Sequence, residues 1–207
     1  MNDEQLAPDD ALAIIAGQRA VAARTQPSSA LLFGVWGAAW LVGYGLMWAT
    51  ALDDGTPAVW AAAVAIGGGA AAIAFTIWHS VHRAQGIRGR SAREGAMYGW
   101  AWALGFLAQG ITVAALAQAG AEPVVVALAA NAMATMVAGL LYVAGGLMWQ
   151  ATPLYALGAW VLLVGALGAF AGLPGSYAVM AFAGGGGMLV AALATRATGG
   201  RSWTDRA

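Results

Sequence analysis

The chain has 207 residues, of which 61% are hydrophobic and only 9% are charged. Because a typical soluble domain is about 25% charged, this composition excludes a soluble globular domain, a disordered chain and a basic nucleic-acid-binding protein. The net charge is zero, and the absence of cysteine excludes disulfides, thiolate metal sites and a cysteine nucleophile. All nine cations are arginine, which excludes a retinal-type Schiff base on lysine.

Six apolar stretches are long enough to cross about 30 Å of hydrocarbon at about 1.5 Å per helical residue. They lie near residues 30–51, 57–80, 95–119, 123–148, 154–172 and 176–195. Proline follows Thr56, Glu122 and Thr152, as is typical of helix starts. The sequence therefore predicts an all-α polytopic membrane protein whose six helices form three hairpins.

Three segments are expected along the chain. Residues 1–28 form an N-terminal cytoplasmic segment, 29–195 the transmembrane domain and 196–207 a cytoplasmic tail. The first segment begins with acidic residues, so we do not expect a cleaved signal peptide. Residues from Pro8 to about Arg24 are expected to form a partly amphipathic helix, which lies on the lipid surface or the bundle, or binds a partner.

The arginines predict the orientation of the bundle. With six spans, all nine fall on one side, in three groups: Arg19 and Arg24; Arg83, Arg88, Arg90 and Arg93; Arg196, Arg201 and Arg206. The loops on the other side carry Asp53, Asp54 and Glu122 and no cation. Because cytoplasmic loops are enriched in arginine, we predict a multi-pass protein of the cell membrane with both termini cytoplasmic.

Glycine runs occur in every second span, at Gly67 to Gly69, Gly145 to Gly146 and Gly184 to Gly187. Small residues allow helices to approach closely in lipid, so we expect these runs to be packing sites. A hinge at the last run is the alternative. The apolar pattern after Leu32 partly recurs after Leu154, which is a parallel hairpin repeat or a coincidence within a narrow alphabet.

No Asp, Glu, Arg or Lys lies in the central part of a span, and ordinary proton-coupled carriers and voltage sensors use such residues. The deepest polar groups are Gln109, Thr112, Asn131 and Thr135. Gln109 and Asn131 lie at similar depth in the third and fourth spans, where they can hydrogen-bond across the hairpin. This polar layer is a structural clamp, or it lines a pathway for a solute.

Two histidines, His79 and His82, lie three residues apart at the cytoplasmic end of the second span. They are interfacial titrating groups or, alternatively, a pH-sensitive or metal site. The acidic residues on the side opposite the arginines, Asp53, Asp54 and Glu122, belong to separate solvated turns or together bind a cation. The sequence shows no motif for catalysis, a metal centre or a cofactor, so we expect none of these.

The arginine loop, with Arg83, Arg88, Arg90 and Arg93, is the most distinctive segment. Juxtamembrane arginines attract anionic lipid at about 1 kcal/mol each, and they also fit a site for a cytoplasmic partner or a phosphorylated ligand. We expect the lipid bilayer to surround the chain. A cytoplasmic or membrane protein, or a second copy of the chain, is a further possible partner.

The stretches GVWGAAWLVGYG (34–45), GIRGRSAREGAMYGWAWALGF (86–106) and AGGGGMLVAAL (183–193) resemble uncharacterised six-span membrane proteins of the actinobacterial type. That group implies no reaction, cofactor or site residue. We expect a non-enzymatic subunit or regulator that docks a partner through its cytoplasmic face. The alternative is a small-solute transporter or channel that uses the polar layer.

Overall fold

The computed structural model describes residue 17 and residues 27–85 and 89–197. The expected helix between Pro8 and Arg24 and the tail beyond residue 197 therefore lie outside the described residues. The elements are α2 (Ser29–Ala49), α3 (Val59–Arg83), α4 (Arg90–Gln118), α5 (Pro123–Met148), α6 (Thr152–Ala171), α7 (Gly175–Ala178), the π-helix η1 (Val179–Gly185) and α8 (Gly186–Ala197). No strand occurs in these ranges, and six helical spans are apolar and long enough to cross a membrane.

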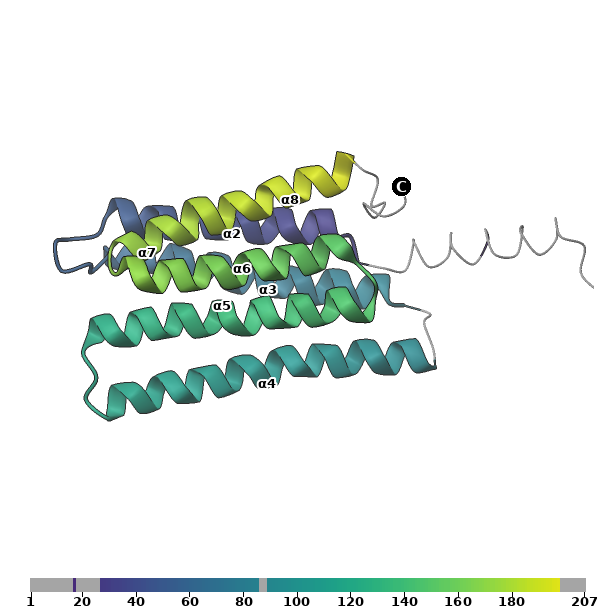
Figure 1. The fold of residues 1–207 in the computed structure, drawn as a ribbon, viewed down its shortest axis with the longest axis horizontal. Helices are drawn as coiled ribbons and strands as arrows, with labels where there is room; N and C mark the ends of the chain where they lie inside the picture. Colours follow the sequence, from purple (N-terminus) through teal and green to yellow (C-terminus); the bar gives the residue numbers. More distant parts are fainter. Residues whose placement is uncertain (1–16, 18–26, 86–88, 198–207) are drawn as a thin grey trace, which may run out of the picture.

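The six spans alternate in direction along the chain, the last of them made of α7, η1 and α8, so their charged ends separate (Figure 1). Arg83, Arg93 and Arg196 lie at the end where α3 stops, α4 begins and α8 stops, which we call the arginine end. Asp54 and Glu122 lie in the connections at the opposite end, which we call the acidic end. The topology thus separates the charges as the sequence predicts.

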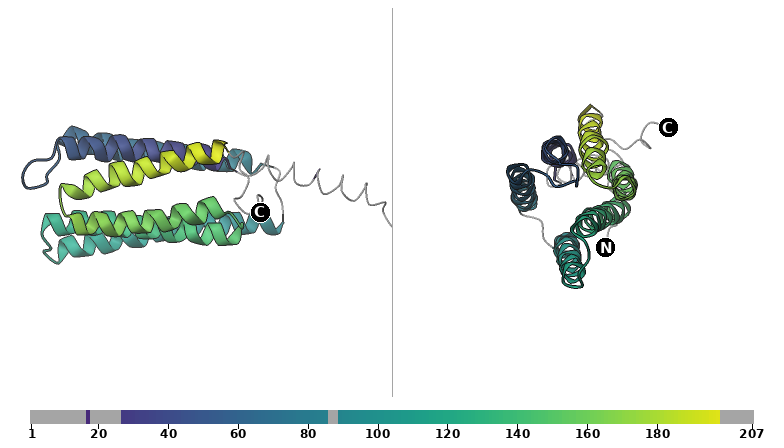
Figure 2. Two further views of the ribbon diagram at one scale, coloured as in Figure 1. Left: turned by 45° about the horizontal axis from the view of Figure 1, so that its top comes forward. Right: turned by 90° about the vertical axis from the view of Figure 1, so that its left-hand side faces the viewer.

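The six spans lie side by side in an open arc whose two ends are α3 and α4 (Figure 2). From one end of the arc, α3 packs on α2, and α2 packs on the last span, η1 and α8. This last span packs on α6, α6 packs on α5, and α5 packs on α4 at the other end. The most extensive packing joins α5 to α6, which belong to different hairpins of the predicted three. The apolar core lies among α2, α5, α6 and α8, around Phe33, Val161 and Met188.

Glycines create the close approaches within the arc. On α6, a Cβ on Gly158 would lie 2.6 Å from the Val143 backbone nitrogen, and on α5 a Cβ on Gly146 would lie 2.6 Å from the Tyr155 nitrogen. Backbone atoms cannot move aside as a side chain does, so only glycine fits there. The prediction that Gly145 and Gly146 are packing sites is therefore confirmed.

The other two glycine runs differ from each other. Gly184 packs on the Trp40 ring and Gly185 on the α2 backbone, whereas a Cβ on Gly67, Gly68 or Gly69 would meet no atom within 4 Å. The packing prediction is thus correct for the sixth span and wrong for the second within this chain. The π-helix η1 ends at Gly185, so close packing and irregular helix geometry coincide at the last run.

The proline-marked helix starts are only partly as expected. Glu122 is the N-cap of α5 with proline directly after it, as predicted. The second span instead begins at Val59 with Ala58 as its N-cap, and the Ala58 N–H donates to Thr50 Oγ1 at 3.2 Å. The third span begins at Arg90, after Gly89 with φ of 82°, a conformation that glycine adopts readily.

Candidate functional site

The expected polar layer has partners that the sequence did not indicate. Gln109 reaches across the hairpin, but its Nε2 donates to the Ala130 carbonyl at 3.4 Å rather than to Asn131. Asn131 Oδ1 instead accepts a hydrogen bond from the Tyr44 hydroxyl at 2.7 Å. The two amides therefore serve different neighbours: Gln109 ties α4 to α5, and Asn131 ties α5 to α2.

The two threonines of the layer bond to their own helices. Thr112 Oγ1 donates to the Ala108 carbonyl at 2.9 Å. Thr135 Oγ1 lies 2.9 Å from the Asn131 and Ala132 carbonyls and packs against Gly165. Such bonds satisfy a hydroxyl without a tertiary partner. All four polar groups therefore bond within the protein, but only Gln109 and Asn131 join different helices.

The histidines have unlike surroundings. His79 is buried, and its Nε2 accepts a hydrogen bond from the Ser28 backbone N–H at 3.1 Å. His82 is exposed, and its ring stacks on that of Trp78 with centroids 5.8 Å apart. An accepting nitrogen carries no proton, so this bond requires neutral His79. His79 thus fastens the start of α2 to α3. Among the described residues no three metal-ligating side chains come together.

The predicted arginine site falls at the junction between α3 and α4. Arg83 ends α3, and Arg93 lies in the first turns of α4. Arg88 and the side chain of Arg90 lie outside the described residues. The chain therefore concentrates positive charge between the two helices at the ends of the arc.

A pocket of about 430 Å³ lies at the acidic end. Three connections meet there, and they contribute Asp54 before α3, Glu122 before α5, and Leu173 and Tyr177 around the start of α7. Asp54 Oδ1 accepts a hydrogen bond from the Thr56 backbone N–H at 2.8 Å. Hydrogen bonds from the Thr56 backbone and side chain lower the pKa of Asp54. The sequence assigned these acids to separate turns or to one cation site, and the fold brings Asp54 and Glu122 to one pocket.

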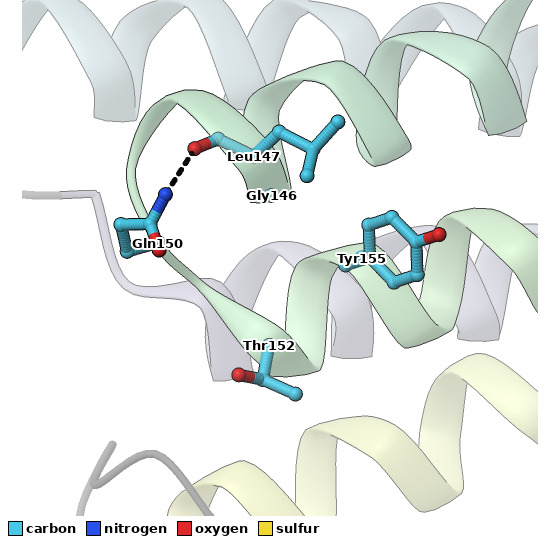
Figure 3. Close-up of a pocket in the computed structure, with 5 residues that line it drawn as sticks. All are labelled: Gly146, Leu147, Gln150, Thr152 and Tyr155. Atoms are coloured by element: carbon cyan, nitrogen blue, oxygen red, sulfur yellow. Dashed lines mark hydrogen bonds between the residues drawn. The ribbon is translucent and has the colours of Figure 1, made fainter. Parts of the chain in front are cut away.

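A second pocket, of about 250 Å³, lies between α5 and α6 at the arginine end (Figure 3). Gly146, Leu147, Gln150, Thr152 and Tyr155 line it. The Gln150 Nε2 donates to the Leu147 carbonyl at 2.9 Å, so the turn itself uses this amide. No charged side chain lines the second pocket, so it offers no charged group that could bind a ligand.

The fold gives three residues surroundings that the sequence does not indicate. Tyr44 bonds to Asn131 from a helix far away in the chain. Ser176 is completely buried in α7, and its Oγ has no hydrogen-bond partner in the described part of the chain. Tyr177 stacks on Tyr44 with ring centroids 6.4 Å apart. Only the tertiary fold brings these groups together.

Comparison of the chain with protein-family models, curated proteins and solved structures finds no match. Its function must therefore be inferred from its own residues.

Proposed function

We propose that this integral membrane protein is a non-enzymatic subunit or regulator that docks a different membrane protein. The partner would contact the arginine end, on the cytoplasmic side, and the outer faces of α3 and α4. One observation carries the proposal: α3 and α4 are spans that each pack mainly on a single neighbour. No described residue of α4 is buried.

The outer face of α3 has the composition of a helix–helix interface. Ala63, Gly67, Ala70 and Ala74 share one side at helical spacing, opposite the side that packs on α2, and all four are exposed. Trp60 and Trp78 lie at the two ends of this stripe and are 57% and 61% exposed. By contrast, Gly37, Gly158 and Gly185 lie against the backbone of a neighbouring helix.

The outer face of α4 repeats this pattern. Gly95, Gly99, Ala103 and Gly110 lie on one side of the helix and are exposed. A Cβ on any of these three glycines would meet no atom within 4 Å. Helix association in lipid depends on close packing of small residues. These faces would gain that packing from a span of another chain.

The charge pattern favours a partner of a particular kind. Arg83, Arg88, Arg90 and Arg93 lie between α3 and α4 in the chain. A partner whose cytoplasmic segment is acidic and whose spans are apolar would meet the arginines and both helix faces at once. This complementarity supports a different protein rather than a second copy, because a second copy would bring its own arginines to the junction.

Purification from native membranes tests the proposal. We would tag the C-terminus and compare the wild-type chain with R88Q/R90Q/R93Q and with the matched tail variant R196Q/R201Q/R206Q. We expect a stoichiometric protein partner with the wild type and the tail variant, and loss of most of it with the loop variant. A homo-oligomer without another protein, or equal recovery from both triple variants, would overturn the proposal. Protease accessibility of the tag would verify that both variants keep the wild-type topology.

The second candidate is a small-solute transporter or channel that uses the polar layer. The pocket at the acidic end favours it, because Tyr177 lines the pocket and stacks on Tyr44, which bonds to Asn131. These contacts lead from the pocket into the bundle. The internal hydrogen bonds of Gln109 and Thr135 support it less, since both groups already have protein partners.

A further inference from the structure

We propose that the pocket at the acidic end binds a small organic cation, an ammonium group on an apolar body. The pocket combines two carboxylates, an aromatic hydroxyl and apolar walls. It lies at the end of the bundle opposite the arginines, so a ligand bound there would not contact the arginine loop.

The charge of the pocket is uncompensated. Asp54 and Glu122 line it, and the connections at this end contain no arginine, lysine or histidine. Within the described chain, the Glu122 carboxylate makes no hydrogen bond or ion pair, and Asp54 Oδ1 accepts from the Thr56 N–H. Both carboxylates therefore have free acceptor positions for an ammonium group.

Tyr177 supplies an observation independent of the acids. The residue is only 3% exposed and lines the pocket. Its hydroxyl has no hydrogen-bond partner among the described residues. The hydroxyl oxygen keeps some exposed surface, because it is not one of the fully buried atoms, so it can accept a hydrogen bond from a ligand N–H group. Its ring is held by Tyr44, whose own hydroxyl is fixed by Asn131. The hydroxyl is therefore a fixed acceptor on a rigid ring.

The size and walls of the pocket favour an organic cation over a bare metal ion. Small-molecule pockets measure about 300–1,000 Å³, and this one measures about 430 Å³. Pro57, Pro123, Val124, Ala127 and Leu173 form apolar walls. Two carboxylates are fewer ligands than a calcium site uses. The apolar part of the ligand would contact the walls, and its ammonium group would contact the acids.

Calorimetric titration of the whole chain in maltoside micelles, at physiological salt, tests this site. The probe is 2-phenylethylammonium, and the matched neutral probe is 2-phenylethanol. We expect saturable binding of the ammonium compound and no detectable binding of the alcohol. Absence of ammonium binding up to about 10 mM, which corresponds to negligible affinity, would overturn the proposal, as would equal binding of the alcohol.

Variants assign the binding to this pocket. We expect Glu122→Gln to weaken ammonium binding about tenfold or more, because it removes a contacting charge. Asp53→Asn removes the same charge from the α2–α3 connection outside the pocket lining, and we expect a change of less than about threefold because salt screens it. Equal losses in the two variants would overturn the site. Tyr177→Phe removes only the hydroxyl, and unchanged affinity in this variant would overturn its role as acceptor.

The ammonium group has two natural sources, a free amine or the headgroup of an ethanolamine lipid. Repeating the titration in bilayer discs with and without phosphatidylethanolamine distinguishes them. Competition by the lipid assigns the site to a headgroup, and undiminished binding assigns it to a free amine. Both results require the wild-type binding described above.

Discussion

Gly37 of α2 and Gly185 of η1 bring two helix backbones into direct contact. A Cβ on Gly37 would lie 2.9 Å from the Gly185 carbonyl oxygen, and a Cβ on Gly185 would lie 2.8 Å from the Gly37 carbonyl oxygen. Each glycine makes room for the backbone of the other. This crossing joins the first span to the last and holds the middle of the arc together.

Alanine at either position should loosen this crossing. We expect Gly37→Ala and Gly185→Ala each to lower the stability by about 1–3 kcal/mol, as overpacking of a tight interior does. The measurement is thermal unfolding in detergent, followed by the fluorescence of the tryptophans.

Gly67→Ala is the matched control, because it adds the same methyl group to a helix where nothing lies within 4 Å. We expect no loss, and a gain of up to about 1 kcal/mol from helix propensity. Equal destabilisation by all three substitutions would show that the crossing is not special.

His79 should stabilise the start of α2 through its bond to the Ser28 N–H. We expect His79→Leu to cost about 1–3 kcal/mol, because a part-buried donor loses its partner, and to accelerate hydrogen exchange in residues 27–33. His82→Leu should leave that exchange unchanged, because exposed His82 contacts Trp78 rather than α2. If the two variants exchange alike, the His79 bond does not hold the helix start.

The bond between Tyr44 and Asn131 should appear as a coupling energy. In a double-mutant cycle with Tyr44→Phe and Asn131→Leu, we expect about 0.6 kcal/mol, and up to about 1.7 kcal/mol, the range for hydrogen bonds within membrane bundles. Tyr44→Phe combined with Thr112→Val should be additive, since Thr112 bonds to its own helix. A coupling near zero for the first pair would mean that this bond contributes nothing to stability.

Hydropathy and charge sufficed to predict the spans and their alternating direction. The length of a hydrophobic stretch does not depend on which helix packs against it. The spans that contain Gly67 and Gly185 can therefore both be predicted from hydropathy. The positions of Arg93 and Glu122 at opposite ends followed from counting spans.

The partners within the bundle could not be predicted in the same way. The helical rise gives the depths of Gln109 and Asn131 but not the rotation of either helix about its axis. The contact between Asn131 and Tyr44 therefore cannot be predicted from the sequence. Gly67 and Gly185 occur in similar glycine runs, yet only one meets another backbone. The contribution of Tyr177 to a pocket depends on three connections that are distant in sequence.

The proposed partner surface on α3 and α4 is the central claim, and site-specific photo-cross-linking tests it most directly. Because the chain has no cysteine, Gly67→Cys and Gly99→Cys each create one thiol for a benzophenone maleimide in native membranes. Leu163→Cys on α6, at a side chain that is 58% exposed, is the control. We predict that positions 67 and 99 cross-link to one other protein, identified by mass spectrometry, and that position 163 yields lipid adducts only. Lipid adducts alone at all three positions, or cross-links only to a second copy of the chain, would contradict the claim.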